Sequence, residues 1–403
     1  MQTRRRIKWA EIVLILFISI TVVGCLKSTE QPIPTEETAG NEETVEEESI
    51  VVEEKVIVEE GCIATPKSAE NSEEQGYTEV EVFFATDRNQ LLPGETPKYF
   101  GTERSDLKYG VCYVSIPRDH RMGELEAPGR FLFWRLKEDP RYHIVTLNAE
   151  VLPSDTFFEH LQSQIMNCDQ KSALIFFHGF NVTFDDAARR TAQMAYDLGF
   201  KGAPVFYSWP SQGKVALYTV DEQTIEWSQA NMRQFLEDFF EKSNADNVYL
   251  IGHSMGTRGL TRALIEILRE KPEIKTRLKE IILAAPDIDA DVFKRDIAPQ
   301  IISHGENLTL YTSADDKALE ASRIVHKAPR AGNSKFGVTI VPGMETIDAT
   351  GQDTGFLGHS YIGDIYSLLS DLYALMMNEH RAPERFGLEC IECREGRYWK
   401  FKE

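Results

Sequence analysis

The chain has 403 residues and a formal net charge of −20 at neutral pH. This length fits one large α/β domain with appendages, since single domains of that class often reach about 200–250 residues. No compact basic stretch is available to neutralise phosphates, which argues against nucleic acid as a partner.

The first 25 residues have the pattern of an export signal. A basic head within residues 4–8 precedes an apolar run from Ile12 to Val23, and Gly24 and Cys25 follow it. Twelve helical residues span about 18 Å, against about 30 Å for a bilayer core, which disfavours a transmembrane anchor. The ending resembles the lipobox of bacterial lipoproteins, whose cysteine is acylated and becomes the new N-terminus. We therefore expect residues 1–25 to be a lipoprotein signal peptide, with an ordinary secretory signal as the alternative.

An acylated Cys25 would make the membrane a partner of the protein. Several acyl chains on one residue give stable anchoring, where a single chain is marginal. We expect an extracytoplasmic location in a bacterial cell envelope. Leu26 carries no acidic retention mark for the inner membrane, so the outer membrane is expected where the cell has one.

Residues 26–76 form an acidic segment. Fifteen Glu face only two Lys between residues 30 and 74, which leaves about −7 for the rest of the chain. Such a segment has too little apolar surface to offset its ordering entropy, and its charges repel one another. We predict a disordered tether here, a large α/β domain at residues 77–380 and a C-terminal tail at residues 381–403.

The region after the tether begins with strands and then alternates strands with helices. Short β-branched and aromatic runs at Glu79–Ala85, Gly110–Ile116 and His143–Val151 are expected to start the sheet. Uninterrupted apolar runs then recur between helical segments, which is typical of a mostly parallel, doubly wound sheet covered on both faces. These runs are Ala173–Phe177, Val205–Trp209, Val248–Ile251, Ile281–Ala284 and Leu308–Tyr311.

The helix expected before the third of these runs, Val248–Ile251, can be checked by the period of its apolar residues. Met232, Phe235, Leu236, Phe239 and Phe240 recur at helical spacing and give one apolar stripe. This stripe predicts a helix that packs on the sheet just before Val248–Ile251.

A nucleophile-elbow motif follows the strand Val248–Ile251. Gly252-His253-Ser254-Met255-Gly256 matches G-x-S-x-G, and a helix-compatible run from Thr257 to Arg269 comes next. The motif requires this strand-turn-helix arrangement, because the serine sits in a strained turn and the glycines let helix and strand approach. The helix N-terminus adds positive potential where an oxyanion would form. We predict that Ser254 is a catalytic nucleophile.

A serine nucleophile needs a base and an orienting acid, in the chain order Ser, Asp, His. The polar loop after Leu308–Tyr311 offers Asp315 or Asp316 as the acid, and Asp287 is the alternative. The last strand is expected near residues 345–348. His359 lies in the glycine-flanked loop that follows this strand and is the expected base. The remaining candidates are expected to be structural or surface histidines: His178, His253, His304, His326 and His380.

The oxyanion hole is expected to use two backbone amides. One belongs to Met255, directly after the nucleophile, and the other to the loop that follows Phe177. In that loop the amide of Phe180 is favoured over that of Asn181. Each such donor contributes on the order of 3 kcal/mol to the lowering of the barrier.

No cofactor or metal is required by this chemistry. Cys390 and Cys393 form a lone C-x-x-C, whereas a zinc site needs four ligands. A local disulfide or two free thiols is the expectation for this pair.

Several runs of the chain resemble a known family. They are Val82–Arg88, Val114–His120, His178–Val182, Ala187–Gln193, Ser208–Ser211 and Leu357–Tyr361. They are similar to the bacterial α/β-hydrolases catalogued as domain of unknown function 900, and the resemblance extends from about Val80 to Leu375. It implies the α/β-hydrolase fold and an esterase- or lipase-like activity without a settled substrate. Members often carry Asn-Asp where this chain has Asp315-Asp316, which favours Asp316 as the acid.

The expected function is acyl transfer from a carboxylic ester, from a small molecule or a lipid, through an acyl-enzyme on Ser254. The preference for an ester rests on analogy with the fold. Trp209, Ser211, Phe180 and Met255 are expected to line the pocket. The alternatives are an acyltransferase with the same triad and a non-catalytic surface lipoprotein that uses the fold as a binding module.

Overall fold

The computed structural model describes residues 75–92, 99–128, 130–131, 134–135, 137–168, 170–305, 307–352 and 365–402. The predicted signal peptide, Cys25 and nearly all of the acidic segment lie outside these residues. His359 also lies outside them. Among the helices that are described, none has both the length and the apolar character needed to cross a bilayer.

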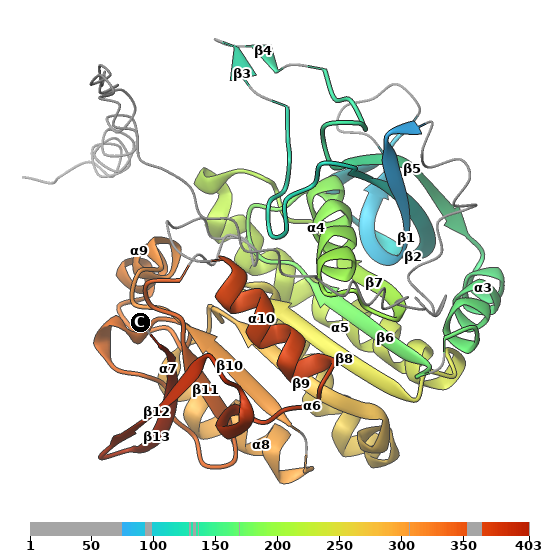
Figure 1. The fold of residues 1–403 in the computed structure, drawn as a ribbon. Coiled ribbons are helices and arrows are strands. Elements are labelled where there is room, and N and C mark those ends of the chain that lie inside the picture. The colour runs from blue at the N-terminus through green and yellow to red at the C-terminus, as the bar shows by residue number, and fades with distance from the viewer. Residues whose placement is uncertain are drawn as a thin grey trace, which may run out of the picture. The chain divides into compact units, whose positions relative to one another are not determined.

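One large sheet organises the described residues (Figure 1). Its eleven strands run in the order β12-β13-β11-β10-β9-β8-β6-β7-β1-β2-β5, so β8 lies near the middle. The strands are β1 (Tyr77–Gln90), β2 (Phe100–Pro117), β5 (Val145–Leu152), β6 (Ser172–Phe177), β7 (Gly202–Ser208), β8 (Asn247–His253), β9 (Leu278–Ala284), β10 (Leu308–Thr312), β11 (Glu345–Asp348), β12 (Leu388–Cys393) and β13 (Gly396–Phe401). A separate two-stranded ribbon pairs β3 (Arg130–Phe131) with β4 (Trp134–Arg135).

The pairing is parallel through the centre and antiparallel at both edges. From β1 through β7, β6, β8, β9, β10 and β11 to β13, neighbouring strands are parallel. At one edge β1, β2 and β5 are antiparallel, and at the other β12 and β13 form a hairpin. The prediction of a mostly parallel, doubly wound sheet is confirmed.

Helices cover both faces of the sheet. The core on one face includes buried residues of α3 (Ser154–Met166), α5 (Tyr218–Lys242), α6 (Gly256–Glu270) and α8 (Ala298–Ser303). The core on the other face includes α4 (Phe184–Asp197) and α10 (Ile365–Met376), and Figure 1 shows α10 across that face. The short elements are η1 (Val215–Leu217), η2 (Pro272–Arg277), α7 (Ala290–Val292), η3 (Phe293–Ile297), α9 (Lys317–His326), η4 (Ser334–Phe336) and η6 (Ala382–Glu384).

Strand β6 shows why the central runs are uninterrupted by polar residues. Ala173, Ile175 and Phe177 enter the core on the α5 and α6 side, and Leu174 and Phe176 enter the core on the other. Because successive side chains of a strand point to opposite faces, a strand covered on both sides must be apolar at every position.

The C-terminal segment differs from the prediction of a tail at residues 381–403. Residues 388–401 form the hairpin of β12 and β13, which extends the main sheet beside β11. Trp399 and Phe401 are buried there, and this burial stabilises the hairpin on the domain. Cys390 and Cys393 are free and exposed. Three residues apart on one extended strand they are separated by about 10 Å, too far for a disulfide.

Candidate functional site

The candidate site lies at the carboxyl edge of the central strands. Ser254 directly follows β8, Asp287 follows β9 and Asp316 follows β10. The loop that begins at His178 follows β6, the other neighbour of β8. Parallel neighbours end at the same edge of a sheet, so the topology brings these four segments together.

Ser254 occupies a strained turn. Its φ is 49°, in the left-handed region, which costs a non-glycine residue about 1–3 kcal/mol. The flanking glycines have a steric reason: a Cβ on Gly256 would lie 2.2 Å from the carbonyl oxygen of His178, and one on Gly252 would lie 2.9 Å from Leu260. Helix α6 therefore starts directly beside the nucleophile, with its positive N-terminal potential at the site.

The backbone of Ser254 is held on both sides of the turn. Its N–H donates to the carbonyl oxygen of Ala284 at 2.9 Å. Its carbonyl oxygen accepts from the amides of Thr257 and Asp287, each at 3.2 Å, and from Oγ1 of Thr257 at 2.6 Å. The strained conformation is thus over-determined by contacts from α6 and from the loop after β9.

The loop after β6 contacts the nucleophile. A Cβ on Gly179 would lie 2.9 Å from Cβ of Ser254, so only glycine allows this approach. The amide of Asn181 is hydrogen-bonded to the carboxylate of Asp221. Within the described ranges the amides of Phe180 and Met255 donate to no other group. Phe180 is therefore better placed than Asn181 to act as the second oxyanion donor.

A buried arginine, Arg88, is hydrogen-bonded to this loop and to the segments beside it. Arg88 is 1% exposed and lies at the end of β1. Its guanidinium donates to Oγ of Ser208 at 2.8 Å and to the carbonyl oxygens of Gly101 at 3.0 Å, Ser211 at 3.0 Å and Val182 at 2.8 Å. Burial lowers the pKa of Arg88 to about 10, so it remains charged at neutral pH.

His178 stays neutral inside the same region. Burial, together with the nearby charge of Arg88, lowers the pKa of His178 to about 3. Its ring stacks on Trp209 with centroids 5.2 Å apart, and the indole N–H of Trp209 donates to the carbonyl oxygen of His178 at 2.7 Å. Trp209 and Ser211 have no exposed surface. Both were predicted to line the pocket, but they lie in the core beneath the loop, and the side chain of Met255, predicted with them, is buried to the same degree.

The two acid candidates after β10 differ in their surroundings. Asp316 is 2% exposed, and its carboxylate accepts from the amide of Leu319 at 2.8 Å, which caps helix α9. Asp315 is exposed and accepts from the amide of Gly351 at 3.0 Å. Of the two, Asp316 is the one held in a fixed, buried position.

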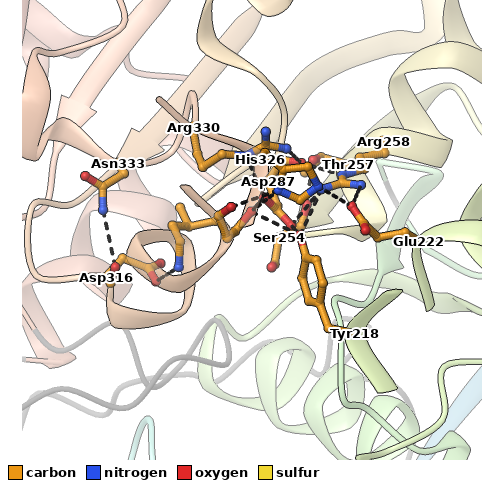
Figure 2. A network of polar contacts seen from close by, with 12 residues as sticks. Tyr218, Glu222, Ser254, Thr257, Arg258, Asp287, Asp316, His326, Arg330 and Asn333 are labelled. Atoms are coloured by element: carbon orange, nitrogen blue, oxygen red, sulfur yellow. Dashed lines mark hydrogen bonds and ion pairs between the residues drawn. The ribbon is translucent and has the colours of Figure 1, made fainter. Parts of the chain in front are cut away.

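Asp287, the third candidate, has its carboxylate fully occupied. Oδ1 accepts from Arg330 at 2.8 Å and from Ser322 at 2.6 Å. Oδ2 accepts from Arg258 at 3.0 Å and from the hydroxyl of Tyr218 (Figure 2). Burial raises the pKa of Asp287, but the two guanidiniums outweigh burial and leave it below its usual range. This saturation disfavours Asp287 as the partner of an imidazole.

The predicted base, His359, lies outside the described residues, so its distance to Ser254 is not defined by the structure. Among the other histidine candidates, His326 has defined contacts. His326 contacts Oε1 of Glu222 through Nε2 at 2.6 Å and the carbonyl oxygen of Ser322 through Nδ1 at 2.8 Å. His304 and His380 are half-buried at the ends of α8 and after α10.

No group of three or more His, Cys, Asp and Glu side chains in the described part of the chain is arranged to hold a metal ion.

Sequence reasoning missed the arginines of the site. In the sequence, Arg88 ends a run that resembles the family and Arg258 belongs to the helix after the motif, and neither pattern predicts a role at the site. Arg258 lies four residues after Ser254, one helical turn on, which was the available signal. Arg330 lies in an irregular segment after α9, and no local pattern indicates its role.

Comparison with known proteins identifies relatives. Residues 154–362 match the family model described as alpha/beta hydrolase of unknown function (DUF900). An uncharacterized protein from Nostoc sp. is 23% identical over 221 residues, which are 45% of this chain and 56% of that protein. The chain thus spans about half the length of this curated relative.

Two solved structures are similar at lower sequence identity. A sugar hydrolase from Lactococcus lactis matches at 18% identity and a TM-score of 0.30, over 51% of this chain and 88% of that one. The carboxylesterase CesB from Bacillus subtilis matches at 12% identity and a TM-score of 0.27, over 57% of this chain and 100% of that one.

Proposed function

This chain belongs to the family described as alpha/beta hydrolases of unknown function, DUF900, and on that premise we propose that it is a serine hydrolase with Ser254 as its nucleophile. The observation that carries the proposal is the elbow itself. Ser254 sits in a left-handed turn at the start of α6, and the uncommitted amides of Phe180 and Met255 flank it.

The proposed mechanism is hydrolysis through an acyl-enzyme. The hydroxyl of Ser254 gives its proton to His359 and attacks the carbonyl carbon, and the amides of Phe180 and Met255 stabilise the oxyanion. His359 then protonates the leaving alcohol. Water then gives a proton to His359 and attacks the acyl-enzyme, and His359 returns the proton to the oxygen of Ser254 as the carboxylic acid leaves. Asp316 orients the imidazole, which its buried position and the saturation of Asp287 support.

The proposed substrate is a carboxylic ester of a small molecule or a lipid. The proposal includes a cell-envelope location, with the protein attached to the membrane by acylation of Cys25. The lipobox-like sequence before Cys25 supports this part. Replacement of Cys25 by Ser is expected to move the protein from the membrane fraction to the soluble fraction, and an unchanged distribution would contradict the anchor.

A graded set of p-nitrophenyl esters tests the activity. Wild type is expected to hydrolyse at least one chain length, and Ser254→Ala is expected to lose the activity by at least about a thousandfold. Ser303→Ala is the matched control, because Ser303 is an exposed serine at the end of α8, and it should retain full activity. Equal rates for wild type and Ser254→Ala would overturn the proposal.

A further inference from the structure

The turn that carries Ser254 depends on the loop after β9. Ala284 accepts from the N–H of Ser254, and Asp287 donates its own N–H to the carbonyl oxygen of Ser254. This loop is itself strained, because Ala285 has a φ of 48°. The amide of Ala285 donates to Tyr311 at 2.9 Å, which ties the loop to the end of β10. Two left-handed residues, Ser254 and Ala285, thus lie in neighbouring turns that are joined by the hydrogen bonds of Ala284 and Asp287.

Two arginines grip Asp287 at both its carboxylate and its backbone. Arg330 donates to Oδ1 at 2.8 Å and to the carbonyl oxygen of Asp287 at 2.7 Å. Arg258 donates to Oδ2 at 3.0 Å and to the same carbonyl oxygen at 2.5 Å. Asp287 is 1% exposed, and Figure 2 shows it between the two guanidiniums. We name this group of Arg258, Asp287 and Arg330 the elbow clamp.

The elbow clamp connects the turn of Ser254 to the loop after β6, which carries the second oxyanion donor. Arg258 belongs to α6, the helix that begins beside Ser254, so the clamp links the loop to that helix. The hydroxyl of Tyr218 contacts Oδ2 of Asp287, and its ring packs edge-on against Phe180 with centroids 5.1 Å apart. The contacts therefore run without a break from the nucleophile turn to the loop with the second oxyanion donor.

We propose that Asp287 is a positioning residue, and that the elbow clamp holds Ser254 and the oxyanion amides in the geometry for attack. This inference rests on the proposed function. Asp287 does not touch the reacting atoms. It acts through the hydrogen bond that its own N–H donates to the carbonyl oxygen of Ser254. Its ion pairs with the two guanidiniums fix the loop after β9 beside Ala284, which accepts from the N–H of Ser254.

Asp287→Asn tests the proposal, because it keeps the shape and removes the charge that the guanidiniums need. We expect kcat to fall by about a hundredfold with KM changed by less than about twofold, since small displacements of a nucleophile have effects of this size. Glu280→Gln is the matched control. Glu280 is a buried carboxylate on β9, paired with Arg381 at 2.6 Å, at the opposite end of that strand. The Glu280→Gln variant should be less stable than wild type, but its folded form should keep the wild-type kcat.

Ser322→Ala is the milder second variant, because it removes one donor to Asp287 without unbalancing charge. We expect about a threefold loss of kcat. A kcat for folded Asp287→Asn equal to that of Glu280→Gln would overturn the proposal, as would an unchanged kcat in Ser322→Ala if Asp287→Asn does not fold.

Amide hydrogen exchange of residues 252–257 separates this inference from the proposed function. The clamp predicts that Asp287→Asn increases exchange at the Ser254 amide by at least tenfold, whereas Glu280→Gln leaves it unchanged. If wild type lacks any Ser254-dependent activity but this exchange difference appears, the hydrolase proposal fails and the clamp's hold on the turn stands. If the activity is present and neither kcat nor exchange responds to Asp287→Asn, the clamp fails alone.

Discussion

The two loops of the candidate site are supported by buried charges of opposite sign, a guanidinium under one loop and a carboxylate under the other. Beneath the loop after β6, one guanidinium, that of Arg88, is solvated by a hydroxyl and three carbonyl oxygens. Beneath the turn of Ser254, one carboxylate, that of Asp287, lies between two guanidiniums. These hydrogen bonds of Arg88 go to neutral groups, with the carboxylates of Asp87 and Asp221 acting on it from nearby. Asp287 instead forms direct ion pairs with both guanidiniums. The second region should therefore be the more sensitive to loss of its central residue.

The largest loss in the free energy of unfolding is expected from Asp287→Ala. It leaves Arg258 and Arg330 in a buried site without their shared carboxylate, and breaking a buried ion pair costs about 3–5 kcal/mol. Urea unfolding measures the change. A loss below about 1 kcal/mol would show that the charges of this region are not coupled as described.

A smaller loss is expected from Arg88→Met, at about 2–3 kcal/mol. The substitution fills similar volume but leaves four acceptors without their donor, and among the described residues it breaks no direct ion pair. The same urea experiment compares the two variants directly. If Arg88→Met proves more damaging than Asp287→Ala, the ranking of the two regions is wrong.

A methyl group between the two regions is expected to separate them. Gly256→Ala places a Cβ 2.2 Å from the carbonyl oxygen of His178, so the loop after β6 must move away from the turn of Ser254. We expect a loss of about 1–3 kcal/mol and at least a tenfold lower rate with any ester that wild type hydrolyses. Gly387→Ala is the control, since nothing lies within 4 Å of its added Cβ, and it should behave as wild type.

The smallest effect concerns a third buried charge, away from the site. His120 contacts Glu126 at 2.8 Å through Nδ1 and Asp197 at 2.8 Å through Nε2. Burial lowers its pKa, but the hydrogen bonds with both carboxylates outweigh burial and leave the pKa above 6.5. Because the folded pKa is raised, the stabilisation is complete below the unfolded value of 6.5 and is lost as pH rises through the folded value.

His120→Gln tests this pH dependence. Wild type should melt a few degrees above the variant at pH 5–6, and the gap should shrink toward pH 9. A gap that is constant over this range would show that the contact does not depend on the charge of His120. Asp287, whose pKa lies below its usual value, stays charged across this range, so the loss of stability in its variants should not follow the same pH dependence.

The sequence predicted the central strands and the elbow because their signals are local. Apolar residues make up most of β6 and the centre of β8, and apolar runs recur in β9 and β10. The glycines beside Ser254 mark a turn where no Cβ fits. The supports could not be predicted. The partners of Asp287 range from Tyr218 to Arg330, and only the topology of the sheet brings them together.

The C-terminal hairpin shows the same limit at the edge of the fold. Strand β12 has few buried positions, so its sequence has the composition of a tail. The alternation that buries Trp399 and Phe401 in β13 was the available signal, but an edge strand of six residues gives a weak period. Its place beside β11 is a tertiary effect.

Labelling with a fluorophosphonate probe tests the central claim most directly. The account predicts one adduct on wild type, located at Ser254 by peptide mass spectrometry, and none on Ser254→Ala. A folded wild-type protein that remains unlabelled, or an adduct on any other serine, would contradict it.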